Sequence, residues 1–161
     1  TAEQLSTLQR SQAGFIMLFG QDRDQLRAFY CQAWQDHRGG KPLQPLQAQI
    51  VSVIERHPEY HALLEHPERA LSRDYLPESG QTNPFLHMGM HLAIREQVST
   101  DRPPGIRDLY RQLSLRCTDE HQLQHQLMEC LAEMLWQAQR DGTVPDEARY
   151  LDCIRALAAD R

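Results

Sequence analysis

The stretch that decides the fold runs from Asn83 to Ser99 and reads NPFLHMGMHLAIREQVS. Asparagine is a favoured N-cap residue, and Pro84 suits the first position of a helix, where its missing N–H group has no hydrogen bond to lose. Apolar side chains then follow on almost every side of the predicted helix. Such a helix lies among other helices, so we expect a buried central helix at about residues 84–99.

Helical signals continue on both sides of this segment, and no run of residues alternates in the manner of a strand. Apolar periodicity with cap residues or prolines predicts further helices at residues 22–37, 45–57, 106–115, 118–140 and from 145 onward. Thr118 is the expected N-cap of the longest helix, whereas the segments after Pro58 and Pro67 are expected to form only short turns. The sequence therefore predicts an all-α fold of about five to seven helices.

The length of 161 residues fits one domain with a real core. Residues 1–16 have the weakest periodicity, and Met17 is a candidate natural start. We therefore expect an N-terminal extension over 1–16, which need not be native, and a single compact helical domain over 17–161.

Charge and composition limit the classes of partner and the cellular compartments that we expect for this chain. The net charge of −5 argues against a protein that grips a nucleic-acid backbone. No apolar run reaches the ~20 residues that cross a bilayer. The four cysteines include no C-x-x-C pair, so reduced thiols in a cytoplasmic protein are the default expectation. The class of partner stays unknown, and a homo-oligomer is left open.

Histidines four residues apart are the most informative pattern in the chain. They occur as three pairs, namely His57 with His61, His87 with His91, and His121 with His125. Random placement of eight histidines gives only about 0.4 such pairs. On a helix, two residues four apart lean over one patch and can reach one ion. Pro58 breaks the helical register of the first pair, so either His57 or His61 is the ligand expected from it.

These histidines predict a divalent-metal site. The predicted ligands are His57, His61, His87, His91, His121, His125 and Glu129, and Glu65 is a further candidate. Glu129 extends the row of His121 and His125 by one more turn. Imidazole with a carboxylate suits zinc, iron or nickel. Three or four protein ligands with an open position would permit hydrolytic or redox chemistry.

Two other interpretations stay open. The histidines of a non-enzymatic helical interaction module would form a hydrogen-bonded network in its core. A histidine that titrates near neutral pH would instead serve acid–base catalysis without metal. The sequence contains no H-E-x-x-H motif, no phosphate loop and no G-x-S-x-G elbow. No nucleotide or organic cofactor is implied, and whether the chain is an enzyme is left undecided.

Three stretches carry a resemblance to a known family. They are RDQLRAFYCQAWQDHRGGKPLQPLQAQIVSVIERHPEYHALLE, GQTNPFLHMGMHLAIREQVSTDRPPGIR and EHQLQHQLMECLAEMLWQAQRDGTVPDEARYLDCI. Together they resemble a proteobacterial family catalogued only as a domain of unknown function, the 1841 family, from about Met17 to Leu157. The resemblance implies a small cytoplasmic bacterial protein. It supplies no catalytic residues, so the site rests on the histidines.

Overall fold

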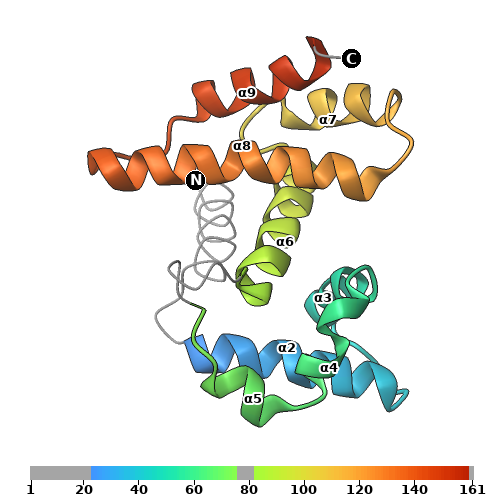
Figure 1. Ribbon diagram of the computed structural model, residues 1–161. Coiled ribbons are helices and arrows are strands. Elements are labelled where there is room, and N and C mark those ends of the chain that lie inside the picture. Colours follow the sequence, from blue (N-terminus) through green and yellow to red (C-terminus); the bar gives the residue numbers. More distant parts are fainter. Residues whose placement is uncertain (1–22, 76–81, 160–161) are drawn as a thin grey trace, which may run out of the picture. The chain divides into compact units, whose positions relative to one another are not determined.

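The computed structural model describes residues 23–75 and 82–159, and the regular structure in these two ranges is entirely helical (Figure 1). The elements are α2 (Arg23–Arg38), α3 (Pro45–Glu55), the 3-10 helix η1 (Pro58–Tyr60), α4 (His61–Leu64), α5 (Pro67–Ser72), α6 (Pro84–Thr100), α7 (Ile106–Ser114), α8 (Glu120–Asp141) and α9 (Glu147–Ala159). The all-α prediction is confirmed. The expected extension over residues 1–16 lies outside the described residues.

The predicted number of helices was slightly too low. Within the described ranges the chain forms eight α-helices, where five to seven were expected. The difference lies in α4 and α5, which occupy the segments that were expected to form turns after Pro58 and Pro67. Proline ends the preceding helix but suits the first turn of a new one, so each proline here separates two helices.

The contacts of the chain form two compact units. Unit 1 ends at Ala93, unit 2 begins at Ile94, and the boundary falls inside α6. The single domain expected over residues 17–161 stays a prediction. The two units are described separately below.

Unit 1 is built around α2, which packs against α3, α4 and α5. Its apolar core includes Tyr30, Trp34, Ile50, Ile54, Phe85 and Met88. Arg27 is also buried there, at 2% exposure. Its guanidinium donates to the carbonyl oxygens of Ala70 at 2.8 Å and Arg73 at 2.6 Å, so the last turn of α5 is tied to α2.

Unit 2 is organised by α8, the longest described helix, with α9 alongside it (Figure 1). The buried face of α8 includes Leu123, Leu127, Leu131 and Met134. Tyr150 and Ile154 are the buried residues of α9. The Tyr150 hydroxyl donates to Oε1 of Gln97 at 2.6 Å, which ties α9 to the last part of α6.

The predicted start of α6 is confirmed. The Asn83 side chain accepts hydrogen bonds from the backbone N–H groups of Phe85 and Leu86, and α6 begins at Pro84. Only Leu86, Ser99 and Thr100 are exposed along its 17 residues, as the apolar sequence predicts for a buried helix.

The predicted starts of α8 and α9 were too early by one and two residues, respectively. Asp119, not Thr118, caps α8 by accepting from the His121 N–H group. Asp146, which follows Pro145, accepts from the N–H group of Arg149 just before α9. In both places a carboxylate lies next to the expected residue, and negative charge is favoured at the positive end of the helix dipole.

The cysteines correct the expectation of reduced thiols. Cys130 of α8 and Cys153 of α9 form a disulfide, with their Cα atoms 5.8 Å apart. Cys31 and Cys117 are not disulfide-bonded in the described part of the chain. A sequence separation of 23 residues hides the pair from any search for closely spaced cysteines. Among the described helices, none is both long and apolar enough to cross a membrane.

Candidate functional site

Three histidine rings of unit 1 form a nearly equilateral triangle. The ring centroids of His57 and His87 are 5.0 Å apart, those of His57 and His91 are 4.9 Å apart, and those of His87 and His91 are 5.0 Å apart. Imidazoles bound to one tetrahedral zinc ion at about 2.1 Å would have centroids about 5 Å apart. The spacing of the three rings therefore matches that of ligands around a single ion.

Burial differs among the three rings. His57 is 2% exposed and His91 is fully buried, whereas His87 is only partly buried. A buried imidazole is costly to leave without polar partners, and a metal ion is one such partner. His57 and His91 are therefore the more strongly constrained members of the triangle.

A backbone carbonyl sets the tautomer of His57. Its Nδ1 atom lies 2.7 Å from the carbonyl oxygen of Val53, one turn earlier. A carbonyl oxygen only accepts, so Nδ1 carries the proton, and in the neutral ring Nε2 keeps its lone pair. Metal-binding histidines commonly have this arrangement, with one nitrogen bonded to a carbonyl and the other available to the metal.

Pro58 explains why His57 takes up this position. The residue before a proline is disfavoured in the helical region, and His57 has φ −128° and ψ 69° as it leaves α3. The chain then restarts at η1, where the Tyr60 ring lies parallel to the His57 ring at 5.2 Å. Tyr60 was not among the predicted site residues, although an aromatic residue three positions after a histidine was visible in the sequence.

His61, the other candidate of its pair, is engaged differently. Its Nε2 atom lies 2.8 Å from the carbonyl oxygen of Ile54, so Nε2 carries the proton. Its ring packs on Trp34 with a centroid distance of 4.4 Å. These contacts are those of a structural residue, and they favour His57 as the ligand of the pair.

Unit 2 supplies the third predicted pair. The rings of His121 and His125 are 4.4 Å apart on the first turns of α8, and both side chains are partly buried. Their helix is anchored by Tyr110, whose hydroxyl donates to Oε1 of Glu120 at 2.9 Å and accepts from Nε2 of Gln124 at 3.3 Å. Desolvation by burial is the main cause that raises the pKa of Tyr110 to about 12. The hydroxyl therefore stays protonated and holds this turn.

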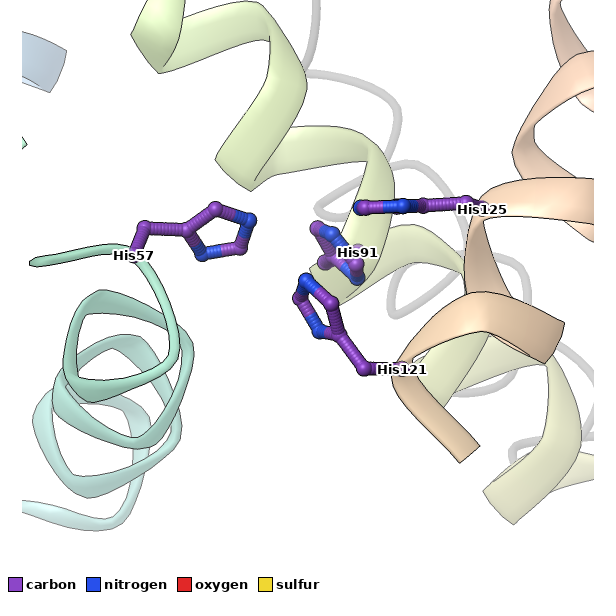
Figure 2. A group of neighbouring side chains, drawn as sticks. All are labelled: His57, His91, His121 and His125. Carbon is purple, nitrogen blue, oxygen red and sulfur yellow. The ribbon is translucent and has the colours of Figure 1, made fainter. Parts of the chain in front are cut away.

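The histidine pairs within each unit bring potential ligand atoms together (Figure 2). In unit 1, nitrogens of His57 and His91 lie within 4.8 Å of each other, and in unit 2 the same holds for His121 and His125. Two nitrogens bound to one tetrahedral zinc ion lie about 3.4 Å apart. Small rotations of the rings would therefore suffice for either pair to hold an ion.

The remaining predicted ligands, both carboxylates, lie at exposed positions that are less suited to binding a metal ion. Glu129 is exposed on α8. Glu65 is exposed and forms an ion pair with Arg38. Carboxylates in contact with water are common without any metal, so neither residue strengthens the case for a site.

Comparison with known proteins places the chain in a family. The model of the family described as Domain of unknown function (DUF1841) matches residues 22–156. The chain belongs to this family. The family match includes every histidine discussed above. No curated protein and no solved structure was found to match the chain.

Proposed function

We propose that this protein binds a divalent metal ion in unit 1 through His57 and His91 (Figure 2), with His87 as the third ligand of the triangle described above. The observation that carries the proposal is the hydrogen bond from His57 Nδ1 to the Val53 carbonyl oxygen, because it makes Nε2 the unprotonated nitrogen of a buried ring, and an unprotonated nitrogen is the one that a metal ion binds. His57 and His91 each offer one nitrogen to such a site.

The number of donors favours unit 1 as the place of the site. Zinc is held by four protein ligands in structural sites and by three in catalytic sites. The pair on α8 in unit 2 supplies two nitrogens, and its nearest carboxylate in the row, Glu129, is exposed. The triangle of His57, His87 and His91 supplies three imidazoles, which leaves a fourth position open.

Nitrogen ligands alone favour zinc, nickel or ferrous iron over magnesium or calcium, which prefer oxygen. Neutral imidazole ligands leave the full charge of the ion uncompensated. A bound hydroxide or an anionic substrate would therefore be stabilised at any open position. This supports Lewis-acid chemistry as the class of activity to test first.

The test measures metal content in protein purified without a tag or a nickel column. We expect about one ion per chain and a lower melting temperature in chelator, since an ion at ~1,000 times its dissociation constant adds about 4 kcal/mol. His57→Ala or His91→Ala should each remove most of the metal. The double variant should lose little more, because ligands of one ion act as a unit. Stoichiometric metal in the double variant would refute the proposal.

The matched control is His125→Ala. His125 pairs with His121 in unit 2, outside the proposed ligand set of unit 1. The variant should therefore keep its metal, whereas His87→Ala should lose most of it. If His125→Ala loses the metal while His57→Ala and His91→Ala keep it, the ion belongs to unit 2, and the proposal is wrong.

A structural histidine network is the alternative supported by a specific observation. Both His57 and His61 are bonded to backbone carbonyls of α3, which is how histidines serve a core without metal. In that case chelator leaves the melting curve unchanged and no metal is detected. Each histidine variant then costs about 1 to 3 kcal/mol, and the losses from distant sites add.

A further inference from the structure

The disulfide of unit 2 lies in the wall of a cavity. The cavity has a volume of about 490 Å³, and Cys130 and Cys153 both line it, together with Glu133, Arg149, Tyr150 and Asp152 among others. Small-molecule sites commonly measure about 300–1,000 Å³. The cavity is therefore large enough for a small molecule in contact with the disulfide.

The two cysteine residues of the disulfide differ in exposure. Cys130 is 3% exposed, whereas Cys153 is only partly buried. A nucleophile must approach a disulfide at the sulfur that it attacks. Attack from the cavity is therefore directed to Cys153, and Cys130 becomes the leaving group.

The charges around the cavity define a class of ligand. Glu133 and Asp152 are carboxylates, and Arg149 is a cation. Their existing partners are exposed surface contacts, such as Arg155 with Asp152 at 2.8 Å and Arg149 with Asp146 at 3.9 Å. Such contacts are weak and exchange easily. Carboxylates next to a guanidinium suit a molecule that carries both an ammonium and a carboxylate group.

We propose that this cavity is a thiol–disulfide exchange site for small zwitterionic thiols of the amino-acid or glutathione type. The thiolate attacks Sγ of Cys153, a new S–S bond forms, and the electron pair of the old bond goes to Sγ of Cys130, which takes a proton from water. A second thiol attacks the mixed disulfide and leaves with its partner as an oxidised dimer. The chain then holds two thiols, having gained two electrons and two protons.

Reduction of the disulfide affects the contact between α8 and α9. The disulfide joins Cys130 to Cys153 across the connection between these helices, and Cys153 is the one cysteine of α9. After reduction α9 keeps its other contacts, which include the buried Tyr150 and Ile154 and the hydrogen bond to Gln97. The thiol therefore controls how firmly α9 is held in unit 2.

The first experiment establishes the chemistry in the full-length chain. Protein purified without reductant should show two thiols under denaturing conditions, from Cys31 and Cys117, and four after reduction. Incubated with oxidised glutathione, Cys130→Ser should form a mixed disulfide at Cys153, detected by peptide mass spectrometry. Cys153→Ser should react more slowly, because Cys130 is buried. Four thiols without reductant, or faster modification of Cys130, would overturn the proposal.

The second experiment tests recognition. The rate of disulfide reduction by glutathione is compared with that by 2-mercaptoethanol, each corrected for its thiolate fraction. Arg149→Gln should slow glutathione by about twofold to fivefold, the effect of losing one exposed charge pair, and leave 2-mercaptoethanol unchanged. Asp108→Asn, an exposed charge on α7 outside the cavity lining, is the control. Equal effects of Arg149→Gln on both thiols would show that the cavity recognises neither, and the proposal would fail.

Discussion

His57 and Val53 lie on consecutive turns, and the 2.7 Å hydrogen bond from Nδ1 to the Val53 carbonyl oxygen turns the other ring nitrogen away from α3. His61 makes the opposite choice, with Nε2 bonded to Ile54. Two histidines four residues apart therefore hold opposite tautomers. This difference separates a potential ligand from a structural residue.

The tautomers can be measured directly. In metal-free protein at a pH where both rings are neutral, nitrogen-15 NMR should report the Nδ1–H tautomer for His57 and the Nε2–H tautomer for His61, because each proton lies against a carbonyl oxygen. Added zinc should then shift the Nε2 signal of His57 and leave His61 unchanged. A His57 ring found in the Nε2–H form would contradict its assignment as a ligand.

His61→Ala should reduce stability without removing metal. The variant loses the hydrogen bond to Ile54 and the packing against Trp34, and we expect a cost of about 1 to 3 kcal/mol. Denaturant unfolding followed by far-ultraviolet circular dichroism measures the loss. Metal content equal to that of the parent is the second part of the expected result, and metal-free His61→Ala protein would show that His61 is a ligand.

Tyr110→Phe should change the response to alkaline pH. The Tyr110 pKa is raised from 10.0 to about 12 in the folded chain, so between these values the unfolded chain releases a proton that the folded chain keeps. Stability therefore falls as pH rises from about 10 to 12, by about 1.4 kcal/mol per pKa unit at most. The phenylalanine variant should lose this part of the slope. Urea unfolding at pH 9 and pH 11 measures it, and identical slopes for both proteins would contradict it.

Loss of the disulfide should destabilise unit 2. In the chain-entropy account, a bond across 23 residues contributes about 3 kcal/mol. Cys130→Ala with Cys153→Ala should therefore unfold at lower denaturant than the oxidised parent. With reductant present the parent should approach the double variant. A parent whose stability is unaffected by reductant would show that the bond contributes little.

The local signals of helix ends were readable from the sequence because they depend on neighbours along the chain. Asn83 and Pro84 fixed the start of α6 in this way. Asp119 displaced Thr118 as a cap because two capping residues stood side by side, and their competition is decided by charge and geometry. A sequence pattern does not resolve which of two adjacent residues caps a helix.

What the sequence could not provide depends on which residues meet in space. The pairing of Cys130 with Cys153 requires α9 to lie beside α8, and no local pattern reports that packing. The choice between His57 and His61 depends on which carbonyl each ring meets, at Val53 or at Ile54. The histidine pairs themselves were predictable because helical spacing alone brings them together.

The buried Arg27 has a consequence for the order in which unit 1 folds. Helix α5 has only six residues, far fewer than an isolated helix needs to persist in water. The groups that satisfy its final carbonyls belong to Arg27, 43 and 46 residues earlier in the sequence. Because α5 depends on a side chain from so far away, we expect it to form only once α2 has docked, and to be among the last helices of the unit to gain protection from hydrogen exchange.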